Sequence, residues 1–180
     1  TLLGQRSGIL NRGEFFEDYN NWIGKSAIAG IRGVSVWESD KPTMVMQYQY
    51  SANWDRGDNF DPDMVLVTPV EQFMRSSLFQ APSNPTFKNN WFNYIIEGDS
   101  TDTNNAKLKS FAIDGDTVYK SYPQLLLNQV PGTNYYWGYT MVSPGPHVVT
   151  TTSKFGGYVY GIGSYMGYSW PAGSATRSLD

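Results

Sequence analysis

The chain has 180 residues, a formal net charge of −3 and no cysteine. This length is typical of one domain, and the lack of cysteine excludes a disulfide framework and any zinc site built from thiolates. Because 13 basic side chains stand against 16 acidic ones, the chain offers no basic stripe to a phosphate backbone, which argues against nucleic-acid binding. No apolar run is long enough for a membrane-spanning helix.

The composition is rich in aromatic residues and glycine, with 13 Tyr and 18 Gly. Aromatic side chains fit the pleated, half-buried surface of a sheet. Period-two alternation recurs along the sequence, whereas a helical pattern is weak wherever it occurs. We therefore predict an all-β fold, an antiparallel β-sandwich of the jelly-roll type, built as a single domain over residues 1–180.

The first strand signal lies in residues 43–50. Met44, Met46 and Tyr48 share one face of this segment, and Gln47 lies on the other. Such alternation is typical of a half-buried strand.

Residues 68–79, TPVEQFMRSSLF, have the weak helical pattern. Pro69 and the β-forming residues before it favour a strand with an irregular end over a helix. We expect Glu71 to be a buried carboxylate with Gln72 beside it.

Three more strand signals follow. Residues 90–97 alternate apolar and other side chains, and Asp114-Gly115 between β-forming residues is the strongest short hairpin signal. The segment YYWGYTMV, residues 135–142, is followed by SPGP and then HVVTTTS. These prolines cannot continue a strand ladder, so the pattern predicts a second hairpin.

The closing stretch, KFGGYVYGIGSYMGYSWPAG, spans residues 154–173. As one continuous strand it places large side chains at even positions, from Tyr158 through Tyr168 to Trp170, and mostly glycine at odd positions such as Gly161. A strand keeps glycines where another group approaches closely. The bare face is either packed against large side chains, the interpretation we favour, or a ligand groove.

Several unusual segments occur in a fixed order. The end of the chain combines Gly-x-His, Phe-Gly-x-Tyr-Val-Tyr-Gly and Tyr-x-x-Pro-x-Gly. LNRGEFF, SDKPTMVMQYQ, FDPDMVLVTPVEQFMRSSLFQAPSN and VPGTNYY precede it. Together, over residues 9–173, they resemble the IgG Fc-binding protein N-terminal domain family, and the cysteine-free chain is most similar to its bacterial members.

The resemblance implies an extracellular or cell-surface module for adhesion or binding, without enzymatic activity, within a longer chain. Fold transfers between relatives more safely than ligand does. The partner is therefore predicted as a protein or glycan at a surface, or as a second copy of the chain. Two alternatives stay open: a self-associating structural subunit of an extracellular filament or layer, and a glycan hydrolase.

Catalytic residues are not evident in the sequence. His147 is the single histidine and follows a Pro-Gly-Pro turn, where we expect its imidazole to be hydrogen-bonded to a neighbouring loop. A hydrolase would need paired carboxylates, for which Glu38, Asp40 and Glu71 are candidates. Sixteen acidic residues form pairs by chance, so we predict no enzyme.

Calcium is the one cofactor that the sequence suggests. The stretch DRGDNFDPD provides hard oxygen ligands, and Asp58, Asp61 and Asp63 are the predicted metal ligands. The stretch lacks the spacing of an EF-hand loop, and the same residues also build solvated turns, so both interpretations stay open.

Two tryptophans are the predicted ligand-binding residues. Trp54 lies in a polar segment, and Trp91 opposes the apolar face of its strand. Aromatic side chains dominate binding hot spots and also stack on sugars. Covering loop edges is the alternative role for both.

Overall fold

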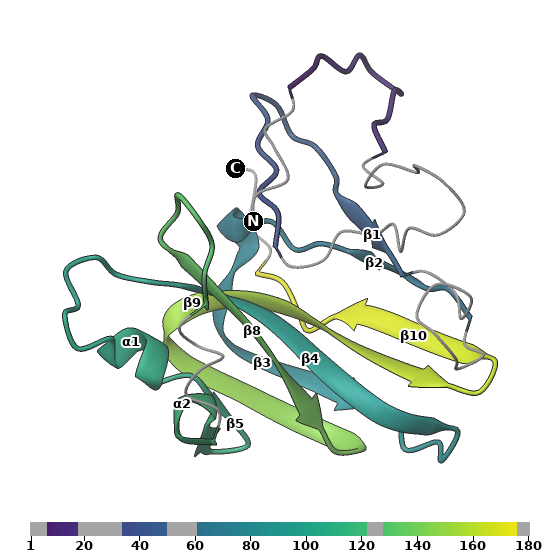
Figure 1. Ribbon diagram of the computed structural model, residues 1–180, viewed down its shortest axis with the longest axis vertical. Coiled ribbons are helices and arrows are strands. Elements are labelled where there is room, and N and C mark those ends of the chain that lie inside the picture. The colour runs from purple at the N-terminus through teal and green to yellow at the C-terminus, as the bar shows by residue number, and fades with distance from the viewer. Residues whose placement is uncertain (1–6, 18–33, 50–60, 122–127, 176–180) are drawn as a thin grey trace, which may run out of the picture.

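The structure is a computed structural model that describes residues 7–17, 34–49, 61–121 and 128–175 (Figure 1). Its strands are β1 (Met46–Tyr48), β2 (Met64–Leu66), β3 (Met74–Ala81), β4 (Phe87–Glu97), β5 (Ala112–Ile113), β6 (Asp116–Thr117), β7 (Asn128–Gln129), β8 (Tyr135–Val142), β9 (Gly145–Gly163) and β10 (Met166–Pro171). The helical elements are one turn each: η1 (Val70–Gln72), α1 (Ala106–Lys109) and α2 (Val118–Ser121). All pairings among these strands are antiparallel, so the predicted all-β antiparallel fold is confirmed.

The 19-residue strand β9 organises the larger sheet. Its first part pairs with β3 and β5, and its second part pairs with β4 and β10. The sheet therefore curls along β9 (Figure 1), and its order continues from β4 to β8 and β7. The rings of Phe79 in β3 and Phe92 in β4 lie 4.8 Å apart, so the two parts of the curled sheet face each other across one core.

Strand β4 supplies the centre of that core. Phe92, Tyr94 and Ile96 are buried, as the alternation of residues 90–97 predicts. Phe111, which follows α1, packs 4.6 Å from the ring of Tyr94. Truncating a buried Phe to Ala typically costs about 3–5 kcal/mol, so these aromatic contacts contribute substantially to the stability of the domain.

The first of the two predicted hairpins forms. Asp114 and Gly115 have φ of 54° and 87°, which is the backbone that a two-residue turn between twisted strands requires. The second predicted hairpin is wrong: β8 and β9 follow each other in the chain but do not pair, because β4 lies between them and pairs with both. Residues 68–79 also behave as predicted, because the 3-10 turn η1 precedes β3. Glu71 is exposed on that turn, so the prediction of a buried carboxylate is wrong.

The closing stretch is a hairpin, whereas the sequence predicted one continuous strand. Strand β9 ends at Gly163, Tyr165 takes a φ of 54°, and β10 returns beside β9. The turn resets the alternation: Tyr168 pairs with Gly161 and lies on its face. Packing of large side chains on the glycine face is confirmed, but the assignment of Tyr168 and Trp170 to the opposite face is wrong.

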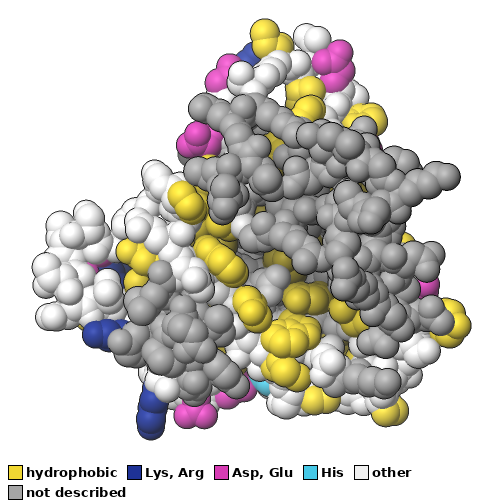
Figure 2. All heavy atoms as spheres, viewed as in Figure 1, with side chains coloured by type: hydrophobic (Ala, Val, Ile, Leu, Met, Phe, Trp, Pro, Cys, Tyr) yellow, Lys and Arg dark blue, Asp and Glu magenta, His cyan; other side chains and the backbone are white. Residues whose placement is uncertain are grey.

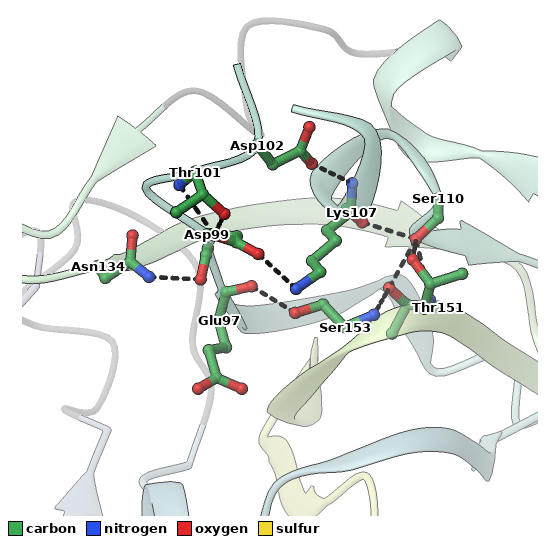
Figure 3. Close-up of polar contacts among 11 residues, drawn as sticks. Glu97, Asp99, Thr101, Asp102, Lys107, Ser110, Asn134, Thr151 and Ser153 are labelled. Carbon is green, nitrogen blue, oxygen red and sulfur yellow. Dashed lines mark hydrogen bonds and ion pairs between the residues drawn. The ribbon is translucent and has the colours of Figure 1, made fainter. Parts of the chain in front are cut away.

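A polar network fastens the loop between β4 and β5 (Figure 3). The Lys107 ammonium lies 2.6 Å from the Asp99 carboxylate, and the Lys107 backbone N–H donates to Asp102. The hydrogen bond from Lys107, helped by Thr101, lowers the pKa of Asp99. Ser110 contacts Thr151 of β9. The network thereby positions α1 and brings the adjoining apolar residues to the core.

Candidate binding surface

Strand β8 carries two different faces. Gly138 and Thr140 are buried on the core side, whereas the side chains between and beside them point outward. A Cβ on Gly138 would come within 2.7 Å of the Tyr94 ring, which shows that this ring covers the core side of β8. Trp137, Tyr139 and Met141 therefore form the outer side.

Trp91 joins these residues from β4. It pairs with Met141 across the sheet, and its ring lies 5.8 Å from that of Tyr139. The Trp137 and Tyr139 rings are stacked at 6.4 Å. We call Trp91, Trp137, Tyr139 and Met141 the aromatic face.

The aromatic face is open to solvent. Tyr139 is 42% exposed and Met141 52% exposed, and the two tryptophans are half-buried. Figure 2 shows hydrophobic side chains gathered in a diagonal band in the region that β8 and β4 occupy in Figure 1. Scattered apolar side chains are normal on a surface, but a contiguous group of aromatic rings indicates a contact site.

A polar border separates the aromatic face from the small sheet of β1 and β2. The hydroxyl oxygen of Tyr158 accepts hydrogen bonds from Asn93 at 2.7 Å and from Gln47 at 2.9 Å. Burial raises the pKa of Tyr158, and the two hydrogen bonds partly oppose this rise. Asn93 neighbours Tyr139 in the ladder, so the border places amide groups beside the rings.

The predicted ligand-binding tryptophans have different outcomes. Trp91 lies on the outer face of β4, as the sequence predicted, and its role in binding stays a prediction. Trp54 lies outside the described residues. The contribution of Trp137, Tyr139 and Met141 was missed, because alternation shows that they share a face without showing which face is outward. No local signal in the sequence indicates it, because the outward face is set by the contact between Gly138 and the Tyr94 ring of β4.

Two of the three predicted metal ligands are described. Asp61 is exposed, and Asp63 accepts a hydrogen bond of 2.7 Å from the Ser169 hydroxyl through Oδ1. Its other oxygen, Oδ2, is buried and has no hydrogen-bond partner among the described residues. Desolvation raises the pKa of Asp63, and the Ser169 hydrogen bond partly opposes this rise.

An oxygen without a partner is a suitable cation ligand, so Asp63 could provide one contact to calcium. Among the described residues, no three acidic or histidine side chains cluster as a metal site would require. Asp58 lies outside the described residues, and calcium stays a prediction.

His147 is buried at a pocket of about 170 Å³ whose other walls come from β8 and the β5–β6 hairpin. Its Nδ1 lies 2.6 Å from Asp114 Oδ2, and its Nε2 lies 2.6 Å from the Ser143 carbonyl oxygen. The predicted hydrogen bond to a neighbouring loop is thus confirmed. With both ring nitrogens engaged, neither is free to accept a proton from a nucleophile.

Asp114 ties the β5–β6 turn to β9. Its Oδ1 accepts the Val148 backbone N–H at 2.8 Å. Desolvation raises the pKa of Asp114, but the hydrogen bonds from Val148 and His147 outweigh it, so the net shift is downward. The Asp114–His147 pair therefore has a structural role.

The carboxylates considered for hydrolysis, Glu38, Asp40 and Glu71, are all exposed.

Comparison with models of known protein families identifies the family of this chain. A family model for the IgGFc binding protein matches residues 3–161, from the N-terminal segment to the second part of β9. The chain belongs to the IgGFc binding protein family. The resemblance to this family seen in the sequence is therefore confirmed, whereas the similarity to its bacterial members stays a prediction. The family is a binding family. No curated protein and no solved structure gave a significant match.

Membership of the IgGFc binding protein family is consistent with the features of the surface. The exposed aromatic face has the composition of a binding site, and the single histidine is held as a structural residue. Among the described residues, the helices are all too short and too polar to cross a bilayer. Membership of this family indicates that the chain is a binding module.

Proposed function

We propose that this chain is a non-catalytic binding module that holds a protein partner on the aromatic face and serves adhesion at a cell surface or in the extracellular space. The observation that carries the proposal is the contiguous group of Trp91, Tyr139 and Trp137 rings on the outer face of the sheet. The family description, which names binding to the Fc part of IgG, supports a protein partner.

The residue types of the aromatic face suit a protein interface. Tryptophan, tyrosine and methionine are enriched at interface cores, and a few aromatic residues carry most of the binding free energy. Trp91 and Trp137 are half-buried, so their rings are already fixed before binding. Fixed rings lose little conformational entropy when a partner docks.

A glycan is the second candidate ligand. Sugar rings stack on tryptophan and tyrosine, and the amides of Asn93 and Gln47 lie at the border of the aromatic face. A protein partner is favoured because the family is described by one. Both ligands would use the same rings, so one set of variants tests both.

The experiment measures binding of the purified domain to immobilised IgG Fc and to a panel of polysaccharides by biolayer interferometry. Trp91→Ala and Tyr139→Ala should each weaken binding to the recognised ligand at least tenfold, which is about 1.4 kcal/mol. Leu78→Ala is the matched control, since Leu78 is an exposed apolar residue on β3. Equal affinity of all three variants would contradict the assignment of the site.

Comparing the two kinds of ligand, IgG Fc and polysaccharide, distinguishes a protein partner from a glycan. Binding to Fc without binding to polysaccharide supports the protein partner, and the reverse pattern supports a glycan. Release of reducing ends from a polysaccharide would establish the hydrolase alternative and overturn the non-catalytic role.

A further inference from the structure

The pocket beside His147 adjoins the aromatic face. Strand β8 supplies one wall, and the β5–β6 hairpin with the first residue of α2 supplies the other. Met141 lines the pocket and also belongs to the aromatic face. Met141 is 52% exposed and the Asp114 side chain 49% exposed, so the pocket opens to solvent at this border. A partner that docks on the aromatic face can therefore also reach into the pocket.

The polar groups of this pocket are mainly hydrogen-bond acceptors. Asp114 and Asp116 line it, and its described lining residues include no lysine or arginine. Both ring nitrogens of His147 are engaged, one by Asp114 and one by the Ser143 carbonyl oxygen, so the ring has no free N–H for a ligand. The Asp116 carboxylate is exposed and forms no hydrogen bond or ion pair with another described residue. The pocket therefore favours a ligand that brings donors and positive charge.

Thr140 adds a buried hydroxyl group to the pocket lining. The residue is 6% exposed, and its hydroxyl donates to the Met141 carbonyl oxygen at 3.4 Å, which is long for such a bond. None of the described residues donates a hydrogen bond to the Thr140 hydroxyl oxygen. A hydroxyl oxygen has two acceptor lone pairs, so Thr140 can still accept a hydrogen bond from a ligand.

The apolar walls of the pocket determine which kind of cation fits. Ile113, Val118 and Val142 line it together with the carboxylates. A metal ion would need several oxygen ligands, whereas an arginine side chain combines an aliphatic stem with a charged head. The stem packs against apolar walls, and the guanidinium group carries five N–H donors in a planar fork. Arginine fits better than lysine, because the acceptors come from opposite walls and the guanidinium is the more weakly hydrated cation.

We propose that this pocket receives an arginine side chain of the protein partner, with the guanidinium group beside Asp116 and Asp114. The inference rests on the proposed function, because it requires a protein partner that docks on the aromatic face. Arginine is enriched at interfaces and among the residues that carry most of the binding free energy. The side chains of the aromatic face are uncharged, so the pocket would supply the charge selectivity of the surface.

The first experiment titrates the purified domain with Nα-acetyl-L-arginine amide and follows the binding by NMR. His147 is the single histidine of the chain, so its ring C–H signals report on the pocket without overlap. The arginine probe should shift these signals saturably, with a dissociation constant of about 1–10 mM. Nα-acetyl-L-citrulline amide is the matched neutral probe, since it has a urea group in place of the guanidinium, and it should not produce a saturable shift.

Two variants test the contribution of charge. Asp116→Asn should weaken binding of the arginine probe about fivefold, as expected for an ion pair near the surface. Glu71→Gln is the control, because it removes the same charge from an exposed position on η1, and it should bind the probe as wild type does. The absence of a saturable shift, an equal response to both probes, or unchanged binding to Asp116→Asn would overturn the proposal.

The second experiment identifies the source of the guanidinium group. In the assay with immobilised IgG Fc, Asp116→Asn should also lose about fivefold in affinity, whereas Glu71→Gln should not. Equal Fc affinity of these two variants would overturn the placement of a partner arginine in the pocket, even if Trp91→Ala weakens binding. Binding of polysaccharide in place of Fc would overturn the protein partner and with it the arginine of that partner. The probe titration does not use the aromatic face, so the two failures are distinguishable.

Discussion

The ring of Tyr168 lies directly over Gly161, the residue that it pairs with across the β9–β10 hairpin. A Cβ on Gly161 would come within 2.3 Å of Tyr168 Cε1 and 2.8 Å of Asn90 Oδ1. Neither distance is tolerated by real side chains. The packing of the neighbouring Tyr168 ring therefore requires glycine at position 161. At this position the glycine face of β9 is packed against a large side chain and is not a ligand groove.

Gly161→Leu should lower the stability of the domain markedly. Overpacking of a filled core typically costs about 1–3 kcal/mol, and a large side chain costs more. The midpoint of urea denaturation measures the effect. Gly8→Leu is the control, because a Cβ on Gly8 meets nothing within 4 Å. An unchanged midpoint for Gly161→Leu would mean that the strip is open and belongs to a groove.

The closing hairpin also shows a limit of sequence reasoning. Periodicity predicts the glycine face of β9 correctly, but the turn at Ser164 and Tyr165 lacks the Asn-Gly or Asp-Gly signal that identified the turn at Asp114. A tyrosine with positive φ is rare, and here the pairing of the two strands imposes it. Missing the turn inverted the faces of every residue beyond it.

The binding surface shows a similar limit. The sequence indicates that Trp137 and Tyr139 share a face, and it identifies Trp91 as a candidate. Which face is outward depends on Tyr94, whose ring covers Gly138 from the core side. That contact joins β4 to β8 and is a tertiary contact, so no local pattern could predict it. The clamp between His147 and Asp114 was predictable only in outline for the same reason.

Tyr94→Phe should leave the domain as stable as wild type or make it more stable. The Tyr94 hydroxyl is buried and has no hydrogen-bond partner in the part of the chain that the structure describes, and burial raises the pKa of Tyr94. An unsatisfied buried polar group costs about 1–3 kcal/mol, so its removal returns part of that amount. Thermal and urea unfolding give the change in free energy.

The matched control is Tyr168→Phe. The Tyr168 hydroxyl donates to Asn90 Oδ1 at 2.6 Å within the core. Its loss leaves the Asn90 oxygen unsatisfied, so this variant should be less stable by about 1–3 kcal/mol. The two Tyr→Phe changes thus have opposite expected signs. A similar loss in both would show that Tyr94 has a partner after all.

Asp63→Asn should change how stability depends on pH. Because desolvation raises the folded-state pKa of Asp63 above its ordinary value, the protonated form is favoured in the folded state. The stability that this group contributes is complete below the unfolded pKa and is lost as pH rises through the folded pKa. Asparagine cannot ionise, and its side-chain oxygen can still accept the Ser169 hydrogen bond.

Urea unfolding of wild type and Asp63→Asn tests this direction of the pH dependence. The measurements run from about pH 4, close to the ordinary pKa of Asp, to about pH 8. The advantage of the asparagine variant should increase with pH. Comparing the two proteins cancels the contributions of the other carboxylates. A difference that is constant with pH, or that shrinks as pH rises, would contradict a raised pKa.

Calcium should raise the melting temperature of wild type if Asp63 belongs to a metal site with Asp58 and Asp61. At a concentration of 100 times the dissociation constant, binding to the folded state adds about 2.7 kcal/mol. For a domain of this size that corresponds to a rise of about 5–10 °C.

The Oδ2 atom of Asp63 is buried and has no hydrogen-bond partner among the described residues, so a bound cation would also remove the cost of its desolvation. Asp63→Asn should then lose the response to calcium, and magnesium should stabilise wild type less because it requires a stricter octahedral geometry. Identical melting curves of wild type in calcium and in chelator would assign the acidic stretch to a solvated turn.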